Sequence, residues 1–523
     1  MNATAAVQPG KVAEKAPENA DAAAWLAVAA GTLGALMAML DVSIVNSSLP
    51  NIQGEIGASG TEGTWISTAY LVAEIIIIPL SGWLERLLGL RTLLLIAATC
   101  FVGFSMLCGF SETLPMMIVG RVGQGFTGGA LIPTAMTIIA TRLPRHQQPI
   151  GSVMFGATAI LGPIFGPVLG GWLTENVSWH YAFFINLPVG ITLITLLAVA
   201  MPHKRPDFDL FRQADWLGIV GLIMGLGGLT VVLEEGEREQ WFASSDIRTM
   251  AAVSAVGFLL LTIGQLTANR PVIRLSLLRD RHFGAVVAMT TVIGMVIYGT
   301  SYVIPQFLSQ IADYNSLQSG EIVLLSGLPM MAMVPFLPRL MRLIDLRVAV
   351  IFGMMLLAIS AYMETDLTIL STGSAFATSQ IMRGFGTVFS AMFMNQASIR
   401  SVRPDQASDA SGLYNTARNL GGSLALAGVA VIQDQRVWLH SRRIEETMSA
   451  NSVDVQSYMA GQAGMLGSMD TAYQSLGASI QAQALTMTYA DLFFILSVGI
   501  VCVTPLALLL RPIPKNAKPV MAH

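Results

Sequence analysis

The chain has 523 residues, of which 53% are hydrophobic and only 12% are charged, and its formal net charge at pH 7 is −3. An ordinary soluble protein has about 25% charged residues. The composition, with a mean hydropathy of +0.62, therefore excludes a soluble enzyme, a nucleic-acid-binding protein and a disordered scaffold. The three cysteines lie in apolar runs without metal-ligand or disulfide spacing, which argues against a metal site.

Apolar segments follow one another along almost the whole sequence. About 20 apolar residues are enough for a helix to cross a bilayer, and lipid offers no partner for unpaired backbone groups. We therefore predict an all-α membrane protein. The fourteen predicted spans are 24–47, 63–84, 91–110, 114–140, 150–172, 180–201, 215–234, 247–267, 282–308, 320–341, 346–363, 371–398, 408–432 and 486–510.

Basic residues predict the orientation, because they gather on the cytoplasmic side of a membrane. With the N-terminus inside, the outer segments hold only a few of the 29 basic residues, namely Arg238, Arg248, Arg436, Arg442 and Arg443. Both termini are thus predicted to be cytoplasmic, as a disordered tail at 1–23, which lacks a signal-peptide pattern, and a second tail at 511–523. The long polar segment 433–485 is predicted to be an outer loop, either functional or a solvated hairpin.

Two internal similarities predict related halves. The segment 84–91 resembles 340–347, and Arg121 and Arg383 are each followed by glycine-rich sequence. Both similarities pair a span with the eighth span after it. This spacing predicts two six-helix bundles, at 24–201 and 282–510, with two helices inserted at 202–281. Such internal repeats are typical of transporters.

Charged residues inside a membrane are costly and usually functional. Asp41 in the first span and Glu74 in the second are candidate proton carriers, although static pairing with an arginine or with hydroxyl groups is an alternative. Arg121 lies among glycines and is predicted either to pair with the first-span acid or to brace helices. Arg383 and Arg418 are the corresponding candidates in the second half, where a static role is favoured.

The fifth span has a dense pattern of glycine and proline. Two prolines four residues apart remove backbone donors on one face, and glycines permit close helix packing. The pattern predicts a helix that kinks and slides against its neighbour during gating, with a static kink as the alternative. Its residues are Gly162, Pro163, Gly166, Pro167, Gly170 and Gly171.

These motifs resemble those of a known family over nearly the full length of the chain. The segment 40–50, Arg121 with Gly125, the fifth-span pattern at 162–171 and the segment 183–190 are similar to signatures of the fourteen-helix drug:proton antiporters of the major facilitator superfamily, EmrB/QacA type. The long outer segment before the last span is similar to the EmrB branch.

The resemblance implies the major facilitator fold and proton-driven export of hydrophobic or amphipathic toxic compounds by alternating access. It also implies a bacterial inner membrane, a periplasmic adaptor and an outer-membrane channel as partners, and no cofactor besides the proton gradient. In this arrangement 433–485 is periplasmic. Protonation of Asp41 or Glu74 competes with drug binding, and ionised Glu74 attracts cationic substrates.

One motif departs from the family pattern. The loop after the second span usually reads G-x-L-x-D-R-x-G-R, but here Arg86 stands in the place of the acid and Glu85 lies one position early. The charge relay of that loop is therefore in question, with Glu85 or another partner as the replacement. The other residues of this inner-loop motif are Gly82, Gly89 and Arg91.

A central cavity is predicted between spans 1, 2, 4 and 5 and their counterparts 9, 10, 12 and 13. Its candidate lining is polar or aromatic: Asn46, Tyr70, Gln124, Tyr298, Tyr302, Asn395, Gln396, Tyr414 and Asn415.

Three other functions are open. The same scaffold can export one metabolite, such as a fatty acid or a siderophore. It can take up a solute together with protons, although the complete fifth-span motif argues against uptake. A membrane-embedded enzyme or sensor is disfavoured, because the sequence has no HExxH, GxSxG or phosphate-loop motif and no soluble output domain.

Overall fold

The computed structural model describes residues 19–511, except 145, 204–205, 269, 334, 404–405 and 449–452. Within this part of the chain every regular element is helical and none is a strand, which confirms the predicted all-α class. Most of the two predicted tails, 1–23 and 511–523, lies outside the described residues.

The N-terminal group consists of six long helices that contact one another and two short ones. They are α1 (Ala22–Ile56), α2 (Gly60–Gly63), α3 (Trp65–Leu88), α4 (Leu90–Gly109), α5 (Leu114–Arg142), α6 (Gln148–Asn176), α7 (Tyr181–Phe184) and α8 (Asn186–Ala200). The Asp21 carboxylate caps the start of α1 by accepting from the Ala24 amide at 2.8 Å. At the other end Gly57 adopts a left-handed conformation with φ 72°, which glycine allows without steric cost.

A helical pair follows the N-terminal group. Its elements are α9 (Asp209–Arg212), α10 (Trp216–Glu235), the 3-10 turn η1 (Trp241–Ala243), α11 (Ser245–Thr267) and the 3-10 turn η2 (Leu275–Arg279). The helices α10 and α11 pack closely on each other through glycines, and α10 also contacts both α3 and α19. This pair lies within 202–281, where the sequence predicts two inserted helices.

The C-terminal group is built around α12, α16, α17, α19 and α21. Its elements are α12 (Arg281–Gln310), α13 (Ser316–Leu324), α14 (Gly327–Met333), α15 (Leu337–Leu343), α16 (Leu346–Met363), η3 (Glu364–Asp366), η4 (Gly373–Phe376), α17 (Ala377–Thr387), the π-helical η5 (Val388–Met392), α18 (Phe393–Arg400), α19 (Ala407–Thr447), α20 (Val453–Leu466), α21 (Met469–Val503) and η7 (Thr504–Leu509). The predicted span 320–341 is divided among α13, α14 and α15, because prolines at 329, 335 and 338 interrupt the helical hydrogen bonds.

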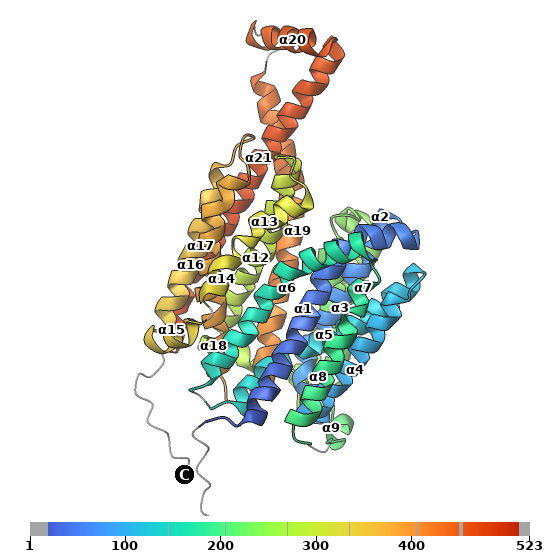
Figure 1. Ribbon diagram of the computed structural model, residues 1–523, viewed down its shortest axis with the longest axis vertical. Coiled ribbons are helices and arrows are strands. Elements are labelled where there is room, and N and C mark those ends of the chain that lie inside the picture. Colours follow the sequence, from blue (N-terminus) through green and yellow to red (C-terminus); the bar gives the residue numbers. More distant parts are fainter. Residues whose placement is uncertain are drawn as a thin grey trace, which may run out of the picture.

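The segment 433–485, predicted as an outer loop or solvated hairpin, is largely helical where the structure describes it. The helix α19 continues to Thr447 and α21 begins at Met469, so both run beyond the helical body and α20 joins them as a projecting hairpin (Figure 1). The segment is polar, but it contains no proline and is rich in alanine, glutamine and methionine, which are good helix formers. Asp491 of α21 holds the base of the hairpin by contacting His440 of α19 at 2.9 Å.

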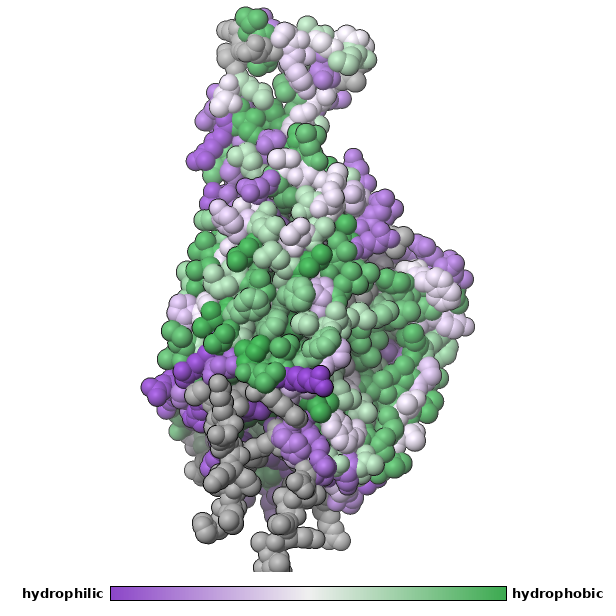
Figure 2. All heavy atoms as spheres, turned by 60° about the vertical axis from the view of Figure 1, so that its left-hand side comes forward, coloured by the Kyte–Doolittle hydropathy of each residue, from purple (hydrophilic) through white to green (hydrophobic). Residues whose placement is uncertain are grey.

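Nine helices of the described residues are long and apolar enough to cross a membrane. Figure 2 shows a broad apolar region across the visible face of the body, with hydrophilic side chains toward both ends. The chain is therefore a multi-pass membrane protein, and the number of fourteen spans stays a prediction. Below, the "termini end" is the end where α1 starts and α21 leads out, and the "hairpin end" is the opposite one (Figure 1).

Candidate functional site

Asp41 of α1 and Arg121 of α5 form an ion pair inside the N-terminal group. Arg121 Nη1 lies 2.6 Å from Asp41 Oδ2, and both side chains are completely buried. Two residues of α3 also hold Arg121: its Nε donates to the Ile66 carbonyl at 3.0 Å, and its guanidinium carbon lies 4.3 Å from the centre of the Tyr70 ring. Because both charges have lost their hydration, removal of either one leaves the other as a buried charge without a counter-ion.

Neutral side chains complete the shell around Asp41. Its Oδ1 accepts from Gln124 Nε2 at 3.0 Å and from Asn186 Nδ2 at 2.7 Å. The Asn186 amide also donates to Ser105 Oγ at 2.9 Å. Gln124 thus belongs to this network rather than to an open cavity. Sequence reasoning gave no role to Asn186 or Ser105, although Asn186 lies in the segment 183–190 that carries the family resemblance.

The glycines of the fifth-span motif lie on the face of α6 that packs against α1. A Cβ on Gly162 would lie 2.8 Å from Met39 Cβ, one on Gly166 would overlap Ser43, and one on Gly170 would overlap Ser47. These contacts flank Asp41 on α1, so the glycines bring α6 directly behind the buried ion pair.

The remaining motif residues on α6 behave differently. A Cβ on Gly171 would meet nothing within 4 Å, and Pro167 is exposed. The Pro163 side chain lies outside the described part. The helix is continuous from Gln148 to Asn176, so the two prolines do not divide it.

Glu74 of α3 differs from Asp41. It is 6% exposed, and the structure gives its carboxylate neither a hydrogen bond nor an ion pair among the described residues. The charges of Arg418 and, more weakly, Arg121 act on it. Gly129 of α5 allows close packing, because a Cβ there would lie 3.0 Å from Glu74 Cα. Glu74 is therefore a buried acid without a fixed partner.

The second-half arginines have different surroundings. Arg383 of α17 forms a buried ion pair with Glu364 of η3, whose other oxygen accepts from Ser379 at 2.7 Å. Arg418 of α19 has a buried Nε without a hydrogen-bond partner among the described residues. Sequence reasoning missed Glu364 because it lies just beyond the predicted span 346–363.

The inner-loop motif connects the two groups at the termini end. Arg86 Nη1 of α3 lies 2.8 Å from Oδ1 and 2.9 Å from Oδ2 of Asp409 on α19. Arg274 Nε approaches the same carboxylate at 3.3 Å, and the Ser408 hydroxyl donates to Glu85. Arg86, which stands where the family pattern has an acid, thus pairs with an acid of the other group.

Glycines frame this contact. A Cβ on Gly82 would lie 2.7 Å from Asp409 Oδ1, so glycine makes room for the carboxylate. Gly89 ends α3 with φ 79°, and Arg91 donates to the Ala198 carbonyl at 2.8 Å.

Exchange of the two charges tests the Arg86–Asp409 contact. We expect Arg86→Asp to lower transport by about tenfold, since it places two acids face to face at a partly exposed site. The double variant with Asp409→Arg should recover most of the activity, as measured by initial transport rates at matched membrane levels. Arg91→Ala is the control. A double variant as impaired as the single one would show that the contact does not matter.

Three cavity candidates lie where the two groups touch. The Gln396 side-chain amide is 3.0 Å from Ser152 Oγ, and the Asn395 and Asn415 amides lie 3.7 and 3.5 Å from the Met136 sulfur. All three are buried. They lie in the contact between the N-terminal and C-terminal groups at the termini end.

The other candidates differ in exposure. Tyr298 and Tyr302 of α12 are 40% and 48% exposed, and Asn46 is exposed and accepts from Ser67 at 2.7 Å. Tyr70 and Tyr414 are buried at 0% and 3% exposure. Tyr298, Tyr302 and Asn46 are thus the candidates with surface that a ligand can reach in this conformation.

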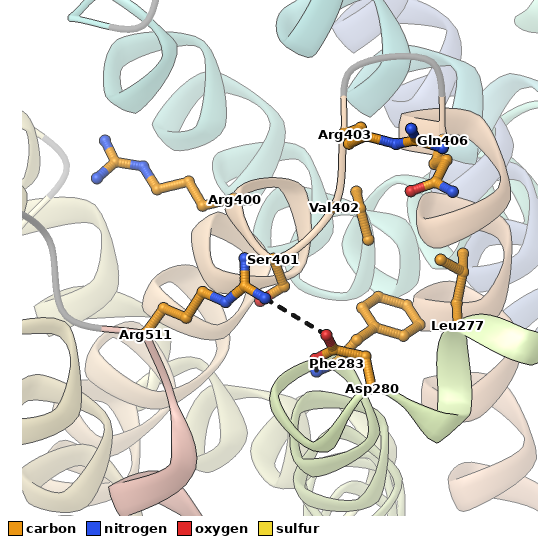
Figure 3. Close-up of a pocket in the computed structure, with 9 residues that line it drawn as sticks. All are labelled: Leu277, Asp280, Phe283, Arg400, Ser401, Val402, Arg403, Gln406 and Arg511. Atoms are coloured by element: carbon orange, nitrogen blue, oxygen red, sulfur yellow. Dashed lines mark hydrogen bonds and ion pairs between the residues drawn. The ribbon is translucent and has the colours of Figure 1, made fainter.

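A separate cavity of about 380 Å³ opens at the termini end (Figure 3). Asp280 caps α12 there by accepting from the His282 and Phe283 amides at 2.8 and 3.2 Å. Burial acts to raise the pKa of Asp280, but these amides and the nearby Arg511 outweigh it and hold the pKa below its usual value. The cavity lies at the edge of the C-terminal group and contains none of the predicted site residues.

Comparison with known proteins assigns the family. The model of the Major Facilitator Superfamily matches residues 31–426. The chain belongs to the major facilitator superfamily. Several of its curated relatives match over most of their length.

This major facilitator is 36% identical over 471 residues to the colistin resistance protein EmrB of Acinetobacter baumannii, covering 90% of this chain and 91% of the relative. It is 28% identical to the multidrug export protein EmrB of Escherichia coli, over 90% and 91%. It is also 28% identical to the fatty acid resistance protein FarB of Neisseria gonorrhoeae, over 95% and 97%.

Solved structures agree on the fold of this major facilitator. The human organic anion transporter MFSD10 matches with a TM-score of 0.58 at 14% identity, covering 91% of this chain and 99% of that structure. The proton:xylose symporter XylE matches with a TM-score of 0.56 at 13% identity, covering 91% of this chain and 94% of that structure.

The polar contacts described above between the N-terminal and C-terminal groups, at Arg86, Gln396 and Asn415, all lie toward the termini end.

Proposed function

We propose that this major facilitator is a proton-driven antiporter that exports hydrophobic or amphipathic toxic compounds by alternating access. The observation that carries the proposal is the completely buried Asp41–Arg121 pair. On α1, Asp41 lies between residues that Gly162 and Gly166 of α6 contact closely. The names of the EmrB relatives, a colistin resistance protein and a multidrug export protein, support the substrate class.

Proton uptake at Asp41 changes the balance of its hydrogen bonds. The ionised carboxylate accepts from Arg121, Gln124 and Asn186. Protonation converts one acceptor oxygen into a donor and removes the charge, so these donors lose acceptor capacity and Arg121 loses its counter-ion. The arrangement becomes less stable, and the population shifts to the alternative conformation. In this proposal α1 slides against the face of α6 that carries Gly162, Gly166 and Gly170.

Glu74 supplies the link to the substrate. Its carboxylate has no fixed partner among the described residues, so an ionised Glu74 attracts a cationic compound, and a proton at the same group opposes that attraction. A proton and a drug then occupy the protein in alternation, as antiport requires. Arg418 moderates the charge of Glu74 from the C-terminal group.

We infer a bacterial inner membrane, with both termini in the cytoplasm. The distribution of basic residues and the bacterial relatives support this placement. The hairpin end then faces the periplasm, where α20 and its flanking helices are accessible to a membrane-fusion adaptor and, through it, an outer-membrane channel. No cofactor besides the proton gradient enters the proposal.

Export of a specific fatty acid is the second candidate, because the FarB relative is a fatty acid resistance protein. The unpaired Glu74 argues for cationic rather than carboxylate substrates, since a fatty acid anion would be repelled.

Cells that lack the protein distinguish the two. We expect them to become more susceptible to chemically varied cationic amphipathic compounds, with at least about fourfold lower inhibitory concentrations, and an Asp41→Asn copy should not restore resistance. Asp470→Asn on the exposed start of α21 is the control copy and should restore it. An increase in susceptibility confined to long-chain fatty acids would favour the second candidate.

A further inference from the structure

The inserted helix α10 ends in two adjacent glutamates that contact different groups. Glu235 is buried and accepts from Thr68 Oγ1 of α3 at 2.6 Å. Glu234 accepts from Ser423 Oγ of α19, also at 2.6 Å. The helix therefore reaches both the N-terminal and the C-terminal group at its last turn, toward the hairpin end.

The two carboxylates differ in charge compensation. Glu235 lies 2.6 Å from Arg238 and is neutralised by it. The partly buried Glu234 has the Ser423 hydroxyl as its partner, and the structure gives it no ion pair among the described residues. An ionised carboxylate has about four acceptor positions. Glu234 thus has no neighbouring cation that pairs with it among the described residues, and it has free acceptor positions.

The Tyr298 ring packs against the same turn of α19 that contacts this carboxylate. Ser423 follows Gly422, and a Cβ on Gly422 would lie 2.8 Å from the ring of Tyr298 on α12. The Tyr298 side chain is 40% exposed, so part of its surface is open to a ligand. The charges of Arg418, Glu74 and Glu234 all act on Tyr298. The ring thus lies within the electrostatic influence of two acids and one arginine.

A carboxylate next to an accessible aromatic face is the chemistry that recognises an organic cation, because the ring quadrupole and the negative charge attract the same ligand. We propose that Glu234 and Tyr298 form a binding site for monovalent organic cations between the two groups, so that the inserted helix contributes a residue that selects the substrate. This inference rests on the proposed export function and extends it to α10, which sequence reasoning left without a role.

The alternative role of Glu234 is a brace that only holds Ser423. Two substitutions separate charge from bracing. Glu234→Gln keeps the oxygen that accepts from Ser423 but removes the negative charge. Ser423→Ala removes the hydrogen bond and keeps the charge. Glu239→Gln, in the loop after α10, removes an acid next to Arg238 and serves as the control.

The experiment measures equilibrium binding of ethidium to the purified full-length protein by fluorescence, and export of ethidium and of the uncharged dye Nile red. We expect Glu234→Gln to weaken ethidium binding by about tenfold, to raise the KM for ethidium export accordingly, and to leave Nile red export within about twofold. Tyr298→Leu should weaken ethidium binding in the same direction, whereas Ser423→Ala and Glu239→Gln should leave it near the wild-type value.

Unchanged ethidium affinity in Glu234→Gln would overturn the site. So would equal losses for both dyes in Glu234→Gln and Ser423→Ala, because that pattern indicates a brace. If the wild-type protein binds ethidium through Glu234 but exports neither dye, the proposed export function fails while the binding site stands.

Discussion

Asp41→Asn is expected to abolish proton-driven export, with a loss of at least about 100-fold, because Arg121 would be left as a buried charge without a counter-ion. Removing one partner of a buried ion pair costs about 3–5 kcal/mol, and the amide cannot carry a proton. The pair is completely buried, and Arg121 Nη1 lies 2.6 Å from Asp41 Oδ2, so water cannot compensate for the lost charge. The measurement is the initial rate of dye export driven by a pH gradient.

Two controls keep this result interpretable. Asp470→Asn on the exposed start of α21 should transport like the wild type. Substrate exchange without a gradient shows whether the Asp41→Asn protein is still folded and still alternates. Full gradient-driven export by a folded Asp41→Asn protein would contradict the role of Asp41.

Gly166→Ala is expected to lower transport by at least about tenfold, although the change adds a single methyl group. The new Cβ would overlap Ser43 of α1, and overpacking of a tight interface typically costs about 1–3 kcal/mol. The substitution forces α1 and α6 apart next to Asp41. Transport rate and the thermal stability of the purified protein are measured together.

The same motif supplies the matched control for Gly166→Ala. A Cβ on Gly171 would meet nothing within 4 Å, so Gly171→Ala should keep its transport rate within about twofold of the wild type. If both substitutions lower transport equally, the motif acts through helix flexibility rather than through the α1–α6 contact.

The central ion pair could be anticipated from the sequence because Asp41 and Arg121 are rare charges in apolar surroundings. The neutral members of its shell could not, since polar residues such as Ser105 occur in many spans, and which of them face Asp41 depends on how five helices pack. The sequence likewise predicts Gln124 as a cavity residue, because it cannot show that its side chain points to Asp41.

Contacts between residues far apart in the sequence could not be predicted either. Asp409 pairs with Arg86 across 323 residues, and no local pattern in the sequence joins them. The unusual Arg86 indicates a departure from the family pattern, with Glu85 or another partner in place of the acid, but it does not point to Asp409. The polarity of 433–485 predicts an outer loop or a solvated hairpin but not its helices, although its lack of proline and its helix-forming composition are compatible with them.

The most direct test of proton-driven export uses everted membrane vesicles that contain the full-length chain and are energised to acidify their interior. We expect ethidium to accumulate inside, accumulation to stop when the pH gradient is collapsed, and addition of ethidium to make the interior less acidic as protons leave in exchange. Accumulation that persists without the gradient, or ethidium and protons moving in the same direction, would contradict the antiport mechanism.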